Sequence, residues 1–371
     1  MAQAEALTRR GLEASRRVLG EKHSLTLQFM QVRASTMVYS GVVPWTEVEP
    51  LFLQALALHR EVLGPDESAT LRLIYGLGLG YAFNFRPAMG APLVADGFER
   101  SRLALGEQHP QTAGLMSLLG HTYSYLNQFE KAEAVSLRSL ELRRKIIGEE
   151  HFLTINSLCI LARIYVQQRQ FDKAVPLTDQ VLRLGQRLPI ENGLFLTWNV
   201  SILGWTYLEQ GQVGEADTLC ELALQATRRK PDGNPLAAAG VLIQLGAVRL
   251  AQEKYSEAEM LLREGSPFVE KYWAEEAYRP YVMSLLGASL SGQKKYAGAE
   301  PLLLQGYQGL QQRQASLPPY LNAPRRITES LERLVQLYDA WGKPAQAAEW
   351  KQKLAAFQQT AKAAEKKGAK P

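Results

Sequence analysis

The chain repeats itself with a period of 42 residues. Tyrosines recur at this interval, and six residues after each of them lies a second recurring position, which is aromatic or otherwise apolar. Five successive steps of 42 residues pass without an insertion. Such regularity predicts a stack of similar units rather than separate globular domains. The two series are Tyr39, Tyr81, Tyr123, Tyr165 and Tyr207, and Trp45, Pro87, Phe129, Phe171, Val213 and Tyr255.

Each unit contains two amphipathic stretches. In the third copy, apolar residues at spacings of 3, 4 and 7 run from Met116 to Tyr123, and a second stripe runs from Phe129 to Leu140. These spacings place the apolar side chains on one face of a helix. Only residues 126–128 separate the two stripes, so we expect an antiparallel helical hairpin.

Small residues recur where the two helices of a hairpin would cross. A glycine inside a helix costs about 0.5–1 kcal/mol relative to alanine. Its recurrence in one register therefore predicts close backbone contact. These positions are Gly78, Gly120, Ala162, Gly204, Gly246 and Gly287 in the first helix, and Ala132, Ala174, Ala216, Ala258 and Ala299 in the second.

A connector of constant length joins one hairpin to the next. It places a glycine after one helix and a threonine six residues later, at the start of the next helix. Histidine occupies the connector at positions 23, 109 and 151. Equivalent positions of stacked helices lie about 10 Å apart, too far for shared metal ligation, so we expect these histidines to hydrogen-bond the turn. The pairs are Gly20 and Thr26, Gly64 and Thr70, Gly106 and Thr112, and Gly148 and Thr154.

Together these features resemble the tetratricopeptide repeat in its 42-residue form, as found in kinesin light chains and many bacterial proteins. The residues that carry the resemblance are Leu119, Gly120, Tyr123, Phe129, Ala132, Leu140 and the connector from Leu105 to Thr112. The resemblance covers about residues 1–312. It implies an all-α fold, a right-handed α-solenoid of antiparallel hairpins.

The register predicts a lone helix near residues 2–18 and then eight hairpins, whose first helices begin near residues 26, 69, 111, 153, 195, 236, 277 and 325. We expect a repeat solenoid over 1–312, a proline-linked capping hairpin over 313–354 and a disordered lysine-rich tail over 355–371. Residues 331–354 resemble the closing hairpin of bacterial repeat proteins that accompany Ser/Thr kinases. Because the chain opens midway through a unit, we also expect the natural protein to extend upstream.

The charge of the chain is concentrated at its end. The net charge is +5 and the pI is about 9.0, but six lysines against one glutamate between Lys351 and Pro371 account for the excess. The first 350 residues hold 36 basic and 36 acidic side chains. Since nucleic-acid binding requires basic residues gathered on the folded surface, we expect no nucleic-acid partner.

The sequence predicts neither a secretion signal nor a membrane span. The first 20 residues contain four arginines and no apolar core. The longest apolar run, from Leu236 to Leu250, is interrupted by Gln244 and Arg249. We therefore expect a cytoplasmic location.

No catalytic motif, cofactor site or metal site is predicted. Cys159 and Cys220 lie in no metal-binding or disulfide pattern. The glycines between Gly76 and Gly80 mimic a phosphate loop, but such a loop should join a strand to a helix, and this stretch falls in the middle of a predicted first helix. The chain is therefore predicted not to be an enzyme.

The resemblance implies an inner, concave wall made by the first helices. Family members of this type often carry an asparagine pair that holds a peptide backbone, whereas this chain has Cys159-Ile160, Ser117-Leu118 or Ser201-Ile202 there. Aromatic residues and arginine are favoured at interface hot spots, although aromatic residues on this wall would equally fill inter-repeat packing. The predicted groove residues are Arg72, Tyr75, His121, Tyr125, Asn156, Arg163, Trp198, Trp205 and Tyr281.

The favoured function is a monomeric, non-catalytic scaffold that holds a peptide or helix of a partner protein in this groove. The first alternative is the regulatory or sensor region of a bacterial Ser/Thr kinase system. An enzyme that acts only with a partner, and a basic tail that docks to an acidic membrane or nucleic acid, are the other hypotheses.

Overall fold

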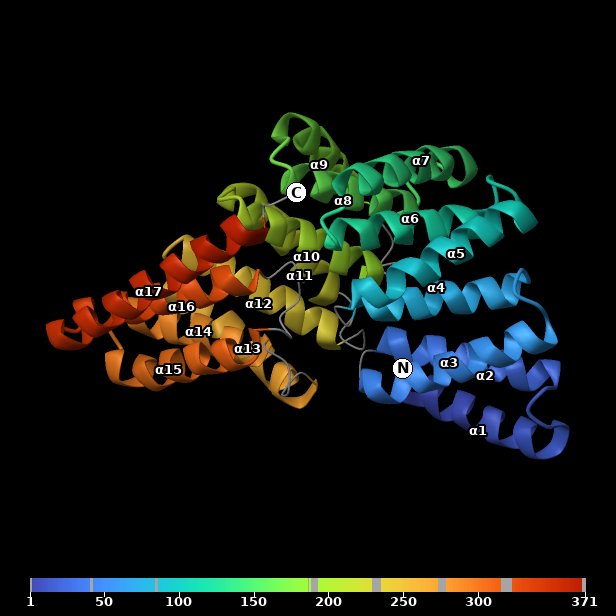
Figure 1. Ribbon diagram of the computed structural model, residues 1–371, viewed down its shortest axis with the longest axis horizontal. Helices are drawn as coiled ribbons and strands as arrows, with labels where there is room; N and C mark the ends of the chain where they lie inside the picture. Colours follow the sequence, from blue (N-terminus) through green and yellow to red (C-terminus); the bar gives the residue numbers. More distant parts are fainter. Residues whose placement is uncertain are drawn as a thin grey trace. The chain divides into compact units, whose positions relative to one another are not determined.

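The computed structural model describes residues 2–40, 43–83, 86–185, 187, 193–228, 235–272, 278–314 and 322–368. Every regular element in these residues is a helix, which confirms the predicted all-α class (Figure 1). The chain divides into two compact units, Met1–Ala238 and Ala239–Pro371.

The first unit consists of a single helix followed by stacked hairpins. Helix α1 (Ala2–Leu19) packs against α2, and each later pair packs as a hairpin. The pairs are α2 (Ser24–Ser40) and α3 (Trp45–Val62), α4 (Ser68–Phe83) and α5 (Pro87–Leu105), α6 (Pro110–Tyr125) and α7 (Phe129–Ile147), α8 (Phe152–Gln167) and α9 (Phe171–Gly185), and α10 (Gly193–Glu209) and α11 (Val213–Arg228).

The second unit continues the same pattern. Helix α12 (Pro235–Ala251) begins at the end of the first unit and lies mostly in the second. The other helices are α13 (Tyr255–Tyr272), α14 (Tyr278–Gly292), α15 (Tyr296–Gln312), α16 (Ala323–Ala340) and α17 (Pro344–Gly368).

The predicted register agrees with the helix boundaries. Each of the eight first helices, which are the even-numbered helices from α2 to α16, begins within two residues of its predicted position. The glycine-rich stretch Gly76–Gly80 lies inside α4, as expected for a first helix rather than a phosphate loop. The division of the chain at residues 312 and 354 stays a prediction, and α17 itself runs without interruption to Gly368.

The connectors are held by one recurring hydrogen bond. The hydroxyl of each connector threonine donates to the carbonyl oxygen of the glycine six residues earlier, at 2.8 Å for Thr26, 2.7 Å for Thr70, 2.9 Å for Thr112 and 2.7 Å for Thr154. The glycine ends the preceding helix with a positive φ, 85° at Gly148, which favours a residue without Cβ.

The connector histidines hydrogen-bond the turn, as predicted, and they cap the helices that follow them. The backbone N–H two residues downstream donates to Nδ1 at 3.2 Å for His23, His109 and His151. The imidazole thereby satisfies one of the backbone donors left open at a helix N-terminus.

The small residues lie at the helix crossings, as predicted. The second-helix alanines at 132, 174, 216, 258 and 299 are fully buried. At Gly204 an added Cβ would lie 2.9 Å from Sγ of Cys220 and 3.2 Å from the carbonyl oxygen of Ala216. The backbones of α10 and α11 therefore approach too closely for a side chain at this position.

The recurring tyrosines join adjacent hairpins. The hydroxyl of Tyr165 donates to Oε1 of Glu133 at 3.0 Å, across from α8 to α7. The same bond recurs between Tyr81 and Glu49 at 2.8 Å, where both residues stand 84 positions earlier in the register. Burial, together with the neighbouring carboxylate, raises the pKa of Tyr165 to about 12. The tyrosines thus act as structural links, with the phenol proton held on the donor.

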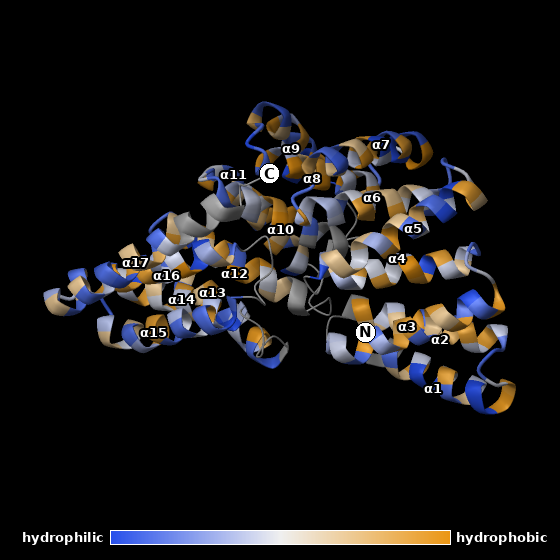
Figure 2. Ribbon diagram, in the orientation of Figure 1, coloured by the Kyte–Doolittle hydropathy of each residue, from blue (hydrophilic) through white to orange (hydrophobic). Residues whose placement is uncertain are grey.

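The two helix types differ in burial. Nearly every residue of α8 from Thr154 to Val166 is buried, whereas α9 buries only Ala174, Thr178 and Val181. Figure 2 shows the contrast as extensive orange on α8 and frequent blue on α9. First helices are buried on two sides, since they pack against second helices and also against one another. Their remaining face forms the candidate site.

Within the described residues, none of the helices combines the length and the hydropathy that crossing a lipid bilayer requires.

Candidate functional site

The first helices of the first unit form a continuous wall. Helix α4 contacts α6, α6 contacts α8, and α8 contacts α10. A small pocket opens on this wall. All its lining residues come from these four helices: Tyr75, Leu79, Ser117, Leu118, His121, Asn156, Ile160 and Asn199.

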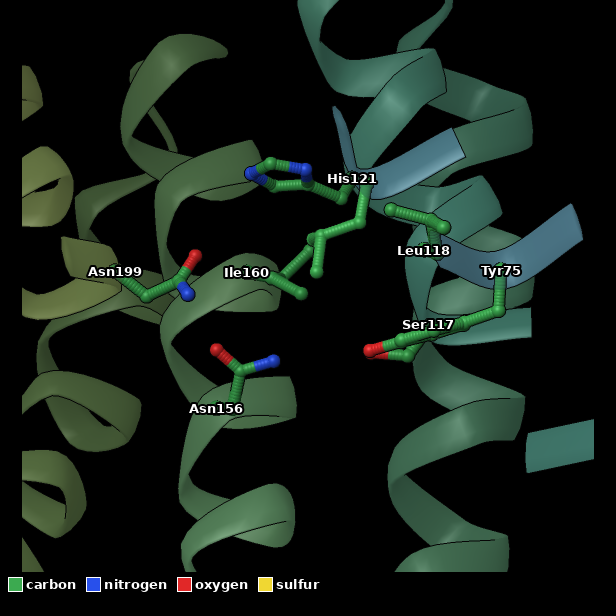
Figure 3. A pocket seen from close by; sticks show the side chains of 8 residues that line it. Tyr75, Ser117, Leu118, His121, Asn156, Ile160 and Asn199 are labelled. Carbon is green, nitrogen blue, oxygen red and sulfur yellow. The ribbon is translucent and has the colours of Figure 1, made fainter. Parts of the chain in front are cut away.

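Figure 3 shows how these side chains surround the pocket. Asn156 and Asn199 lie on one side, Tyr75, Ser117 and Leu118 on the other, and His121 at one end. Helical spacing explains the grouping. Ser117 and His121 are four residues apart on α6, and Asn156 and Ile160 are four apart on α8, so each pair shares one helix face.

Two polar side chains of the pocket are buried, and each has one unpaired atom. Asn156 is 2% exposed and His121 is 4% exposed. The amide oxygen Oδ1 of Asn156 and Nε2 of His121 have no hydrogen-bond partner among the described residues. Because buried polar groups in proteins are normally paired, the wall presents hydrogen-bonding capacity that its own fold does not use.

A buried arginine lies one helical turn beyond Ile160. Arg163 is 2% exposed, and its guanidinium carbon lies 4.6 Å from the centre of the Tyr125 ring. That ring in turn meets the imidazole of His121 edge-on, with centroids 4.7 Å apart. All three guanidinium nitrogens of Arg163 lack hydrogen-bond partners within the part of the chain that the structure describes. The cation is thus held by an aromatic face alone.

Burial and the Arg163 charge perturb the neighbouring titratable groups. Burial, assisted by Arg163, holds the pKa of His121 well below its ordinary value, so the imidazole is neutral. Burial raises the pKa of the Cys159 thiol to about 12, against a smaller opposite effect of Arg163. A buried thiol of this kind is a poor nucleophile.

A second buried arginine nearby is fully engaged. Arg143 of α7 donates through Nη1 to the carbonyl oxygen of Leu153 at 2.6 Å and to Oγ of Ser157 at 3.0 Å. Burial lowers its pKa to about 10. Arg143 therefore has a structural role in joining α7 to α8.

The structure brings five of the predicted groove residues together. Tyr75, His121 and Asn156 line the pocket, and Tyr125 and Arg163 lie beside it. Arg72 is exposed on α4, where Nη1 donates to Oγ of Ser68 at 2.8 Å.

The other predicted groove residues are placed differently. Trp205 is buried and is not among the residues that line the pocket. Tyr281 is also buried and belongs to the second unit, where it packs beneath Arg326. The side chain of Trp198 lies outside the described residues. Whether any residue of the predicted set contacts a partner stays a prediction.

Sequence reasoning missed Asn199 as a pocket residue. The repeat register aligns Asn156 with Trp198, and Asn199 stands one position later. A search for asparagines within one residue of the inner-wall register would have found it. No group of three or more histidine, cysteine, aspartate or glutamate side chains suited to a metal ion occurs in the described part of the chain.

Comparison with protein families identifies the hairpins. The family model of the tetratricopeptide repeat matches residues 129–187, which span α7, α8 and α9. This segment is a tetratricopeptide repeat. A comparison with curated protein sequences found no match.

Solved structures share the helical fold of this chain over most of its length. A Rap protein in complex with competence and sporulation factor is 16% identical, with 97% of this chain and 93% of that chain covered at a TM-score of 0.63. The apo form of the quorum sensor NprR from B. thuringiensis is also 16% identical. The match covers 96% of this chain and 94% of that chain, with a TM-score of 0.54. A Podosopora anserina putative kinesin light chain with TPR-like repeats is 22% identical. The match covers 54% of this chain and 95% of that chain, with a TM-score of 0.41.

Proposed function

We propose that the inner wall of the first unit binds an extended segment of a partner protein, and that the chain serves as a non-catalytic scaffold. The segment would lie across α4, α6, α8 and α10, with its backbone hydrogen-bonded to the side-chain amides of Asn156 and Asn199. A scaffold role is typical of tetratricopeptide repeats, and the similar Rap structure contains a bound factor.

The observation that carries the proposal is that two polar atoms of the pocket lining, Oδ1 of Asn156 and Nε2 of His121, have no hydrogen-bond partner among the described residues. A side-chain amide both donates and accepts, which matches the N–H and C=O groups of an extended peptide. Oδ1 of Asn156 is buried and has no partner. An incoming backbone N–H would satisfy it, and the apolar walls from Leu79, Leu118 and Ile160 would cover the peptide side chains.

A library of immobilised random 12-residue peptides tests the proposal. We expect the full chain to enrich a defined peptide set, and the double variant Asn156→Leu/Asn199→Leu to bind those peptides at least tenfold more weakly, because two buried amide contacts are lost. Circular dichroism of the variant should be unchanged.

The matched control is Arg138→Ala. Arg138 lies exposed on α7, where it pairs with Glu107 and Glu141, and its loss should leave peptide binding intact. Equal binding by the asparagine double variant would refute peptide binding in the groove. So would loss of all binding when residues 355–371 are deleted, and either result would favour another surface.

A role as the regulatory or sensor region of a bacterial Ser/Thr kinase system is a finer proposal. Its support is the resemblance of residues 331–354, in α16 and α17, to closing hairpins found beside such kinases. Co-purification with a kinase that is lost when residues 331–354 are deleted, but not when the pocket asparagines are changed, is the expected result.

A further inference from the structure

Four arginines are buried among the described residues of this chain, and three of them have polar partners. Arg143 donates to Leu153 and Ser157. Arg249 pairs with Glu257 at 3.0 Å. Arg326 pairs with Glu329 at 2.6 Å. Arg163 has only the face of Tyr125.

An unpaired buried cation is costly. Removing a guanidinium from water is unfavourable unless hydrogen bonds or an opposite charge replace the lost hydration. An aromatic face compensates for part of this cost only. The five N–H donors of Arg163 thus remain available to an acceptor from outside the chain.

The second unit shows what completes such an arrangement. Arg326 of α16 lies 5.4 Å from the centre of the Tyr281 ring on α14, the preceding first helix. Arg163 of α8 lies over Tyr125 of α6, again the preceding first helix. Arg326 additionally holds a carboxylate, which Glu329 supplies from its own helix. The residue three positions after Arg163 is Val166, which is apolar and fully buried.

We propose that Arg163, with Tyr125 and His121 beside it, receives the carboxylate of an acidic side chain on the bound segment. This inference rests on the proposed function and names the chemistry of its ligand. The guanidinium fork matches a carboxylate in a bidentate geometry. Because no hydrogen bond holds Arg163, its side chain can turn toward the pocket without breaking one.

The position of Arg163 within the wall favours an acidic side chain over a chain terminus. Helices α4 and α6 extend the wall on one side of α8, and α10 extends it on the other. A segment that lies across α4, α6, α8 and α10, as proposed above, passes α8 in mid-course. It therefore presents side chains, not its carboxyl end, to Arg163.

Three capped tripeptides test the proposal on the full chain by NMR titration at constant ionic strength. Acetyl-Ala-Glu-Ala-amide carries the acidic side chain, acetyl-Ala-Gln-Ala-amide is its neutral isostere, and acetyl-Ala-Ala-Ala with a free carboxyl end carries a terminal carboxylate. The signals followed are the Arg163 guanidinium N–H and the His121 ring. We expect the glutamate peptide to bind at least tenfold more tightly than the glutamine peptide, with shifts at both residues.

Variants locate the effect. In Arg163→Met the preference for glutamate should vanish, in Arg163→Lys it should be reduced but retained, and in Arg138→Met on the outer surface of α7 it should be unchanged. The lysine variant keeps a charge at this position, so it serves as the second variant if the methionine variant folds poorly.

Equal binding of the glutamate and glutamine peptides by the unaltered chain would overturn the proposal. Tighter binding of the free-carboxyl peptide would overturn the choice of an acidic side chain. If random peptides bind in an Asn156-dependent manner without a preference for acidic residues, this inference fails and the groove stands. If the glutamate tripeptide binds at Arg163 while no library peptide is enriched, the proposed scaffold function fails instead.

Discussion

Arg163 in the first unit and Arg326 in the second are buried in similar surroundings. Each projects from a first helix over a tyrosine ring on the preceding first helix, at 4.6 Å and 5.4 Å from the ring centre. Arg326 also pairs with Glu329, which in turn contacts Arg325 and Arg333. No hydrogen-bond acceptor among the described residues reaches Arg163.

The difference separates a structural arginine from a candidate binding residue. Where the fold supplies the carboxylate, the arginine contributes to the packing of its own unit. Where the fold supplies none, the arginine lowers the stability of the free protein, and a ligand that brings an acceptor regains that free energy on binding. The predictions below test this contrast through stability, from the largest expected effect to the smallest.

Glu329→Gln should destabilise the second unit by about 2–3 kcal/mol, because Arg326 would lose its ion pair with Glu329 while remaining buried. The estimate lies below the full cost of an unpaired buried charge because the Glu329 side chain is 22% exposed. Denaturant unfolding, with hydrogen exchange of α14 and α16, measures it.

Glu332→Gln on the same helix is the matched control for this prediction. Burial and the nearby Glu329 raise the pKa of Glu332, so neutralising it should cost little. If the two variants lose equal stability, the contrast between the arginines is not electrostatic.

Arg163→Met should raise the free energy of unfolding by about 1–2 kcal/mol, since an unpaired buried charge is replaced by an apolar side chain of similar length. Arg326→Met should act in the opposite direction, because it leaves Glu329 without its buried partner. Chemical denaturation of both variants measures whether each change raises or lowers the free energy of unfolding. A clear loss of stability in Arg163→Met would show that its contact with Tyr125 outweighs the desolvation of the charge.

Acid should weaken the first unit selectively. The pKa of His121 is well below 6.5 in the folded chain because of burial and Arg163, and it returns to about 6.5 on unfolding. Between these two values the unfolded chain binds a proton that the folded chain does not. The free energy of unfolding therefore falls as pH drops below about 6.5, by at most about 1.4 kcal/mol per pH unit for this group.

The second unit supplies the reference for this prediction, because all five histidines of the chain lie at or before His151. Hydrogen exchange of the two units at pH 7 and pH 5 should show the larger histidine-linked change in the first. Part of that change should remain in His121→Leu, since burial also lowers the pKa of His59. An unchanged pH dependence in His121→Leu would contradict the assignment.

The architecture was readable from the sequence because its determinants are local and repeated. The 42-residue period, the crossing glycines and the threonine six residues after each connector glycine fix helix type, helix start and hairpin pairing. Eight first helices consequently begin where the register places them. The histidine caps followed from the same reasoning, since a residue fixed relative to a helix start has few possible partners.

The site was only partly readable, because it depends on burial and on partners that no register specifies. The family pattern placed Tyr75, His121, Asn156 and Arg163 on the inner wall, but it gave no sign that Arg163 would be unpaired. Asn199 was missed since it lies one position out of register. The same pattern placed Trp205 on the inner wall, with packing between repeats as the alternative, and the pattern could not tell that this side chain would be buried.

The connectors have a consequence for the length of such a protein. The four connectors at Gly20, Gly64, Gly106 and Gly148 each begin with a glycine of positive φ and close with the same threonine hydrogen bond. Removing residues 107–148 would join Gly106 to Glu149 and restore the connector sequence Gly-Glu-x-His with its threonine at the same offset. The joints are therefore interchangeable, and a chain of this kind can gain or lose whole hairpins by duplication or deletion while every remaining interface keeps its geometry.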